Sequence, residues 1–418
     1  MMRLISKVRH LLQWIWQNYW IVLSFGTLVL VVISFVGPFH DLKFTDEKEY
    51  FQIARNVVDF GIYGYDPSQP TPYRAPGYTF FIAAFLRAGL GKDTVNIAQI
   101  LLWAFNGFLT AKICLKLSGQ AAAGAALVFS LLYPLFGYAA LRAYPQTLTA
   151  TLLLVILYLF FFRSPTANYS VKILGVGITA GLSVLTTPPM ALILAGIAAV
   201  ALVLQLASLR SVLTAAAIAC VLTMPWLARN WILFDRAILA TTGGMSLLQG
   251  NSENARPDIS NPDISRYTDA TKDFDDIRSN DYFAKAALNW IKNNPRSAAE
   301  LYIKKLLQFF NYREKYATSK TGGGLAESIL FAAYYPLLIL ALSNLIFARR
   351  WKVSREEVLL FVTYLGAAAF YAAFLVRLRY RIPFDTIVVT LAAIALGRIV
   401  GEDTQRSLQV RVNNELRN

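Results

Sequence analysis

Long apolar runs, separated by polar connections, recur along most of this chain. Most runs are about 17–22 residues long, which is enough for a helix to cross the hydrocarbon core of a bilayer. The pattern therefore predicts an all-α polytopic membrane protein with about ten transmembrane helices. The predicted spans are residues 19–37, 96–116, 120–138, 146–162, 171–188, 190–207, 212–229, 326–346, 357–376 and 383–400.

Two long polar segments, 38–95 and 231–325, interrupt the apolar runs. A short apolar run at 75–89 carries Pro76 and Arg87, so we expect it to be a helix at the membrane interface. If the run 75–89 does not cross the membrane, the main Lys and Arg clusters all fall on the same side of the bilayer. The positive-inside rule identifies that side as the cytoplasm. Both termini are then cytoplasmic, and both polar segments lie outside the inner (plasma) membrane of a bacterium.

The two external segments are predicted to contain helices of their own. Apolar residues from Tyr50 to Val58 recur every three to four positions, which predicts a helix lying flat on the membrane. The elements expected in the second segment are a helix over 276–293, a break at Pro295, a helix into Phe310 and a flexible joint at Gly322–Gly324.

This pattern divides the chain into three parts. Residues 1–230 form an N-terminal transmembrane module, which includes the first external loop, 38–95. Residues 231–325 form the second external loop. Residues 326–418 form the C-terminal transmembrane helices and a short cytoplasmic tail.

Composition narrows the function classes. Hydrophobic residues make up 56% of the chain, and the formal net charge is +15. That charge is typical of positive-inside loops attracted to anionic lipid, so membrane lipid is an expected partner. No basic stripe on a soluble surface is visible, so nucleic acid is not expected as a partner. His10 and His40 have no ligand-spaced neighbours, which makes a zinc site or a histidine-based triad improbable.

Acidic residues are absent from a long central part of the chain. No Asp or Glu occurs from Thr94 to Phe234, so any carboxylate chemistry must come from the two external loops or from Asp385. Coupled transporters usually place acids in mid-membrane, so this distribution argues against a proton- or sodium-coupled carrier. Paired acids, Asp46 and Glu47, open the first external loop.

Several arginines depart from the positive-inside rule, because they fall at the predicted outer face. They are Arg142, Arg229, Arg377, Arg379 and Arg381. The planar guanidinium group suits bidentate binding of phosphate, so this group favours a phospholipid headgroup or a polyprenyl phosphate as ligand. The alternative is that each side chain extends to ordinary lipid phosphate.

Four stretches carry a resemblance to a known family. They are DEKEY (46–50) with YRAPGYTFFIA (73–83), PWLARNWILFDRAILATTGGMSLLQGNSENA (225–255), the run 275–310, and RYRIPFDTIVVTLAA (379–393). In this order, and over nearly the whole chain, they resemble the glycosyltransferase C superfamily. The nearest likeness is to bacterial relatives of the dolichyl-phosphate-mannose protein mannosyltransferases and to lipid A aminoarabinose transferases.

The resemblance implies an inverting glycosyltransferase, hexosyl or pentosyl, that takes its sugar from a polyprenyl-phosphate-linked donor at the outer face. Asp46 is the expected general base, and Glu47 is expected to orient the acceptor or hold Asp46. Arg74, with the arginines named above, is expected to bind the donor phosphate. Tyr78, Gly243, Gly244 and Asn251 are the expected substrate-binding residues.

Alternatives remain open for these residues. Asp46 also suits a helix N-cap, with Glu49 as its capping-box partner. For Glu47 and Glu49 a solvated helix face is the competing interpretation. Tyr78 also suits an interfacial anchor, and the glycines and Asn251 suit turns.

The chain also departs from the family. Gln146 stands where relatives often carry an acid, and Asp235 replaces a common glycine. No cofactor is predicted apart from the lipid-linked donor, although Asp46 and Glu47 together offer ligands for one divalent cation. Two rival functions are a transporter or flippase of lipid-linked sugars and an oligosaccharide ligase that uses a pyrophosphate-linked donor. The sugar and the acceptor, whether glycan, lipid or protein, are not specified by the sequence.

Overall fold

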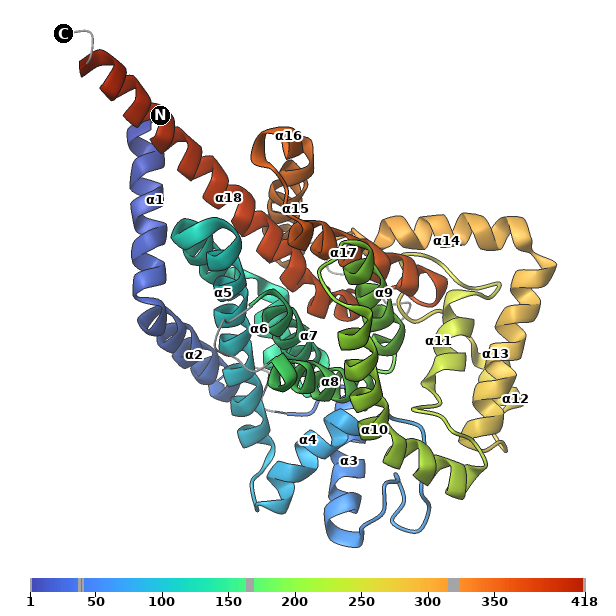
Figure 1. Cartoon of the computed structure of the whole chain (residues 1–418). Helices are drawn as coiled ribbons and strands as arrows, with labels where there is room; N and C mark the ends of the chain where they lie inside the picture. The colour runs from blue at the N-terminus through green and yellow to red at the C-terminus, as the bar shows by residue number, and fades with distance from the viewer. Residues whose placement is uncertain (1, 37–38, 40, 163–168, 315–323, 416–418) are drawn as a thin grey trace.

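The computed structural model describes residues 2–36, 39, 41–162, 169–314 and 324–415, with side chains up to residue 401 except those of Met2 and Tyr169. The described part of the chain is α-helical apart from its connecting segments, with a single isolated bridge between Asp66 and Gln69. The predicted all-α fold is therefore confirmed (Figure 1).

The helices follow one another with short connections, except around the two external segments. In chain order they are α1 (Met2–Gln17), α2 (Tyr19–Val36), α3 (Thr45–Phe60), α4 (Pro76–Arg87), α5 (Lys92–Leu132), α6 (Pro134–Ala140), α7 (Gln146–Phe161), α8 (Tyr169–Thr186), α9 (Met190–Val203), α10 (Leu209–Phe234), α11 (Thr242–Gly250), α12 (Ser265–Ala270), α13 (Asp276–Asn293), α14 (Pro295–Phe309), α15 (Leu325–Ile346), α16 (Ala348–Trp351), α17 (Arg355–Ala373) and α18 (Leu378–Glu415).

Six described helices are long and apolar enough to cross a membrane: α2, α5, α10, α15, α17 and the part of α18 from Leu378 to Gly401. Three shorter apolar helices correspond to α7, α8 and α9. Helix α5 consists of two arms that meet at a bend at Gly119, whose φ of 83° is left-handed and favours glycine. The first arm contains the predicted span 96–116, and the second arm contains the start of the predicted span 120–138. The second arm ends at Leu132, and α6 continues after it. The count of ten spans stays a prediction.

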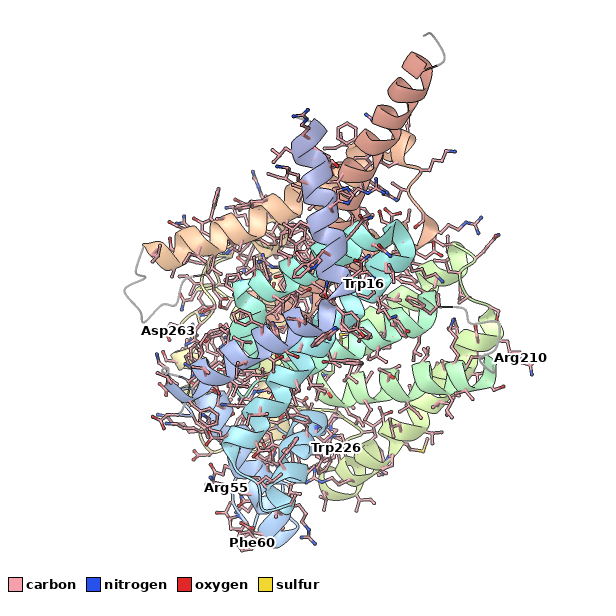
Figure 2. All side chains as sticks on the ribbon, turned by 90° about the vertical axis from the view of Figure 1, so that its left-hand side faces the viewer. Trp16, Arg55, Phe60, Arg210, Trp226 and Asp263 are labelled. Atoms are coloured by element: carbon pink, nitrogen blue, oxygen red, sulfur yellow. The ribbon has the colours of Figure 1, made fainter. Side chains whose placement is uncertain are left out.

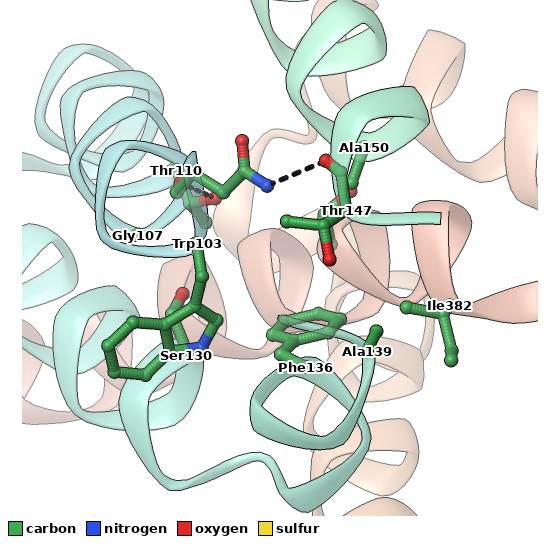
Figure 3. A pocket seen from close by; sticks show the side chains of 11 residues that line it. Trp103, Gly107, Thr110, Ser130, Phe136, Ala139, Thr147, Ala150 and Ile382 are labelled. Atoms are coloured by element: carbon green, nitrogen blue, oxygen red, sulfur yellow. Dashed lines mark hydrogen bonds between the residues drawn. The ribbon is translucent and has the colours of Figure 1, made fainter. Parts of the chain in front are cut away.

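The centre of the helical bundle is closely packed. The two arms of α5, with α6, α7 and α18, enclose a cavity of only about 10 Å³ (Figure 3). That volume is about the size of one water molecule. Asn106 on α5 donates from its Nδ2 to the carbonyl of Thr147 on α7, 3.2 Å away, so a polar contact joins the helices at this level.

Helix α1 was not predicted as a separate element, and it lies beside α5 and the C-terminal part of α18. Leu12 is buried there, and its backbone approaches α5 closely at Gly124. A Cβ atom at Gly124 would lie 1.9 Å from the Leu12 carbonyl oxygen, so only glycine fits. The two described ends of the chain therefore lie at the same end of the molecule, opposite Arg55 and Phe60 on α3 (Figure 2).

In the first external loop, α3 packs on α4. The apolar stripe of α3 includes Tyr50 and Ala54, which are buried in one cluster with Tyr78 and Ile82 of α4. The prediction that this stripe lies flat on the membrane is therefore wrong, because the stripe is covered by protein. The predicted helix at 75–89 is confirmed as α4, which begins with Pro76 at its first position.

In the second external loop, α13 spans the predicted residues, and α14 begins at Pro295 as expected. Helix α10 extends to Phe234, beyond its predicted end at residue 229. It ends at Asp235, whose φ is 53°. This left-handed backbone favours glycine, and Asp adopts it more readily than most other residues. Most of the predicted joint at Gly322–Gly324 lies outside the described residues.

Candidate active site

The carboxylate of Asp46 lies between two arginines that come from distant parts of the chain. Its Oδ1 is 2.6 Å from Nη2 of Arg74, and its Oδ2 is 2.6 Å from Nη1 of Arg379. Arg74 comes just before α4, and Arg379 lies in the first turn of α18. Asp46 therefore joins the two halves of the first motif stretch to the start of the fourth.

Asp46 is not the N-cap of its helix. Phe44 occupies that position, and Asp46 lies in the first turn of α3 with its side chain directed to the two arginines. Burial alone raises the pKa of the Asp46 carboxyl, but the charges of Arg379 and Arg74 outweigh it and lower the pKa to about 2. Asp46 is therefore ionised at neutral pH, and as long as both arginines hold it, it is a weak base.

Glu49 shares Arg74 with Asp46. Nε of Arg74 donates to Oε2 of Glu49 at 3.0 Å, and its Nη2 contacts the same oxygen. The guanidinium also lies over the rings of Tyr50 and Tyr73, 5.1 Å from each centroid. The solvated-face interpretation of Glu49 is therefore wrong, because the carboxylate binds Arg74. Sequence reasoning missed this role, although Glu49 follows Asp46 by three positions and so shares its helix face.

The buried side chain of Glu47 caps the N-terminal end of α3. Its side chain is 1% exposed, and Oε2 accepts from the backbone N–H groups of Lys43 and Phe44 at 2.9 and 3.0 Å. Oε1 accepts from the N–H of Ala143 at 3.0 Å. The solvated-face interpretation of Glu47 is therefore also wrong. Because its oxygens are occupied by backbone donors, the geometry suits positioning of Asp46 better than direct contact with substrate.

Arg142 lies behind this cap. Its Nη1 is 3.9 Å from Oε2 of Glu47 and donates to the carbonyl of Asp41 at 3.4 Å. The guanidinium also lies over the rings of Phe39 and Phe44, at 4.6 and 5.4 Å. Arg142 is buried, and these contacts brace the start of α3.

Arg377 and Arg379 lie on the side of Asp46 formed by the start of α18. The guanidinium of Arg379 lies near two aromatic rings, with its Cζ atom 5.3 Å from the centroid of Tyr144 and 5.4 Å from that of Tyr380. Nη2 of Arg377 donates to Oε1 of Gln249 at 3.4 Å. The Nε–H groups of both arginines are buried without a partner among the described residues. Unpaired guanidinium donors of this kind suit an anionic ligand. Sequence reasoning missed Tyr144.

Arg381 does not join the other two arginines. It is 1% exposed, and its Nε lies 2.9 Å from Oδ1 of Asp385, one turn further along α18. Its Nη1 donates to the carbonyls of Phe309 and Asn311 at 2.8 and 2.6 Å. Arg381 therefore ties α14 to α18, and its charge is neutralised there.

Arg229 is also occupied elsewhere. It donates to the backbone carbonyls of Tyr63 and Thr71 at 3.2 and 3.3 Å, and it lies 4.6 Å from the Trp226 ring. It therefore holds the first external loop against the end of α10. For Arg229 and Arg381, donor-phosphate binding stays a prediction without a supporting contact.

The predicted substrate-binding residues are mainly packing residues. Tyr78 is fully buried, and its hydroxyl donates to Oε1 of Gln99 at 3.2 Å. The interfacial-anchor interpretation of Tyr78 is therefore wrong as well. Gly244 lies inside α11, where a Cβ atom would be 2.1 Å from the carbonyl oxygen of Asn280, whereas Gly243 faces open space. Asn251 donates to the carbonyl of Ala373 at 2.9 Å. The tight turns expected here are replaced by a helix in close contact with α13 and α17.

No group of three or more His, Cys, Asp or Glu side chains that could hold a metal ion occurs in the part of the chain that the structure describes. Asp46 and Glu47, the suggested cation ligands, bind arginines and backbone N–H groups instead. A cavity of about 710 Å³ opens between the first external loop, the end of α10 and the start of α13. Asp235, Asp276 and Phe274 are among its lining residues, and Asp46 is not.

Solved structures with a similar fold are known. No family model and no curated protein matches the chain by sequence. Among solved structures, ArnT from Cupriavidus metallidurans bound to undecaprenyl phosphate is similar, with a TM-score of 0.57 and 14% identity over 90% of this chain and 60% of that one. The archaeal oligosaccharyltransferase AglB from Archaeoglobus fulgidus, in complex with an inhibitory peptide and a dolichol-phosphate, has a TM-score of 0.53 and 14% identity.

The AglB match covers 95% of this chain and 52% of AglB, so the chain spans little more than half the length of these proteins. Both are glycosyltransferases of the C superfamily. The chain shares the fold of these two proteins. The relation suggested by the four motif stretches is thus supported at the level of the fold, and the described helices agree with a membrane protein of this type.

Proposed function

We propose that this protein is a membrane glycosyltransferase that moves a hexose or pentose from a polyprenyl-phosphate-linked donor to an acceptor hydroxyl. The observation that carries the proposal is the Asp46 carboxylate held 2.6 Å from both Arg74 and Arg379, within a glycosyltransferase C fold. The site combines a carboxylate that is able to take a proton with cations that are able to bind a phosphate.

In the proposed reaction the acceptor oxygen attacks the anomeric carbon of the donor sugar. The bond from that carbon to the phosphate oxygen breaks, and the polyprenyl phosphate leaves with the bonding electron pair. Asp46 takes the proton of the acceptor hydroxyl. Because this is a single displacement, the configuration at the anomeric carbon inverts.

Arg377 and Arg379 are the proposed phosphate ligands. Each has a buried Nε–H without a partner among the described residues, and the guanidinium of Arg379 lies near the rings of Tyr144 and Tyr380. Prearranged cations next to a leaving group stabilise the negative charge that develops in the transition state. Arg74 is the third candidate, although Glu49 already binds it.

Binding of the donor phosphate is also expected to raise the basicity of Asp46. The pKa of Asp46 is about 2 because both arginines neutralise the carboxylate. A phosphate that takes over Arg379 removes one of these charges, so the pKa of Asp46 rises and the carboxylate becomes a stronger base. Proton removal is thereby linked to the presence of the donor.

Glu47 acts as a positioning residue in this account. It fixes the first turn of α3 through three backbone N–H groups, and Asp46 is the preceding residue of that turn. We place the site at the external face of a bacterial inner membrane, with cytoplasmic termini, because that orientation keeps the Lys and Arg clusters inside.

The test is an assay in proteoliposomes with a labelled sugar on undecaprenyl phosphate and cell-envelope extract as acceptor. The proposal predicts labelled product of inverted configuration and release of undecaprenyl monophosphate. Movement of intact donor across the bilayer without transfer would indicate a flippase. Turnover only with a pyrophosphate-linked donor would indicate an oligosaccharide ligase.

A further inference from the structure

Lys305 is a buried cation without an acidic partner. It lies on α14 with 1% of its surface exposed, and among the described residues it forms no ion pair. Its Nζ donates to the carbonyl oxygens of Gly250 and Phe374 at 2.7 and 2.8 Å and to Oδ1 of Asn251 at 3.1 Å. A protonated lysine has three N–H donors, and all of them are used here.

The three acceptors come from two chain segments that cross at this point. Gly250 ends α11, and Phe374 follows the last residue of α17. A Cβ atom at Gly250 would lie 1.6 Å from the Phe374 carbonyl oxygen, so the two backbones are in direct contact. Asn251 also donates to the carbonyl of Ala373 at 2.9 Å. Lys305 therefore joins the end of α11 to the end of α17. At this point the two backbones are so close that no side chain fits at position 250.

The segment that leaves this crossing leads to the proposed phosphate ligands. Only Leu375 and Val376 separate Phe374 from Arg377, and Arg379 follows in the first turn of α18. Arg377 is held on the same side by Gln249, the neighbour of Gly250. Displacement of the Phe374 carbonyl would therefore shift Arg377 and Arg379 relative to Asp46.

We infer that Lys305 is a positioning residue, which fixes the segment that brings Arg377 and Arg379 to the lipid phosphate. The inference rests on the proposed function. Lys305 does not contact substrate in this account, because its three donors are already bound to the protein.

A lysine suits this crossing better than an apolar residue. Its ammonium satisfies three buried oxygens at once, and loss of those donors would leave the oxygens unpaired. Burial lowers the pKa of Lys305 to about 7, so keeping the charge here has an energetic cost. Such a cost is consistent with a residue that orders a functional segment.

The experiment measures binding of labelled undecaprenyl phosphate to the purified protein in nanodiscs. Lys305→Met is compared with Lys304→Met, because Lys304 is exposed on the same helix and pairs only with Glu300. We expect Kd to rise about tenfold or more for Lys305→Met, the scale of one misplaced charge-assisted contact, and to stay within about twofold for Lys304→Met. If Lys305→Met does not fold, Lys305→Gln, which keeps an N–H donor, is expected to weaken binding to a smaller extent.

A double-mutant comparison separates positioning from a general loss of structure. If Lys305 acts through the two arginines, Lys305→Met adds little to the loss of affinity already caused by changing Arg377 and Arg379 together to alanine. Full additivity of the two changes, or unchanged affinity in a folded Lys305→Met protein, would overturn the inference alone. Absence of undecaprenyl phosphate binding by the wild-type protein would overturn the proposed function and the inference with it.

Discussion

Oδ2 of Asp46 lies 2.6 Å from Nη1 of Arg379, so an ion pair joins the first external loop to the start of the last helix. The second carboxylate oxygen, Oδ1, is 2.6 Å from Nη2 of Arg74. Each carboxylate oxygen of Asp46 is thus already paired with an arginine. A phosphate that binds these arginines has to compete with Asp46 for them.

This competition predicts that Asp46→Asn binds undecaprenyl phosphate more tightly than the wild-type protein does. Asparagine keeps the shape of the side chain but has no charge, so Arg379 becomes available to the phosphate. The measurement is equilibrium binding in nanodiscs, with Asp66→Asn as a control on an exposed part of the same loop. Weaker binding by Asp46→Asn would contradict the competition and favour a bridging cation.

The same ion pairs predict a pH-dependent contribution to stability. The pKa of Asp46 is lowered from 3.8 to about 2 on folding, so the contribution is present above the unfolded value and is lost as pH falls through about 2. Its size is roughly 2 kcal/mol, since one pKa unit corresponds to about 1.4 kcal/mol. Thermal unfolding should therefore show wild type more stable than Asp46→Asn at pH 6, with the difference shrinking toward pH 2. A constant difference over this range would contradict the assignment.

Glu47→Gln should destabilise the fold. The substitution replaces one carboxylate oxygen with an amide NH2 group, which meets backbone N–H donors instead of accepting from them. A buried hydrogen bond to a charged group contributes about 1.5–3 kcal/mol, so a loss of that order is expected. Thermal unfolding of Glu47→Gln is compared with that of Glu300→Gln, an exposed acid on α14. Equal midpoints for the two variants would argue against the capping role.

Gly243 and Gly244 offer a matched pair of substitutions. Gly244→Ala places a Cβ atom 2.1 Å from the backbone oxygen of Asn280, so α11 has to move away from α13. Gly243→Ala meets open space, and alanine is better than glycine in a helix by about 1 kcal/mol. Thermal unfolding should show a lower midpoint for Gly244→Ala and an equal or higher one for Gly243→Ala. The reverse order would contradict the packing described for α11.

Local sequence signals predicted much of the fold. Helix α13 has its predicted bounds, because an amphipathic pattern begins after Asp275 and ends before Pro295. The bend at Gly119 falls between two predicted spans, as expected for a glycine that interrupts helical backbone. Helix α1 was missed, although Ile5, Val8, Leu12 and Ile15 recur at helical spacing and pack toward α5 and α18.

The site was predicted less completely than the fold. Asp46 stood out because paired acids follow the first span and the middle of the chain has none. The sequence did not separate Arg379 from Arg381, because only the rotation of α18 decides which of them faces Asp46 and which faces Asp385. Lys305 was missed, because its partners are backbone oxygens brought together by the fold.

The most direct test of the central claim is sugar transfer by Asp46→Asn, measured with a labelled polyprenyl-phosphate sugar beside the wild-type protein and the Asp66→Asn control. The account predicts that Asp66→Asn keeps wild-type turnover and that Asp46→Asn loses about 10²–10⁴-fold, the contribution of a positioned general base. Near wild-type turnover by a folded Asp46→Asn protein would contradict the account.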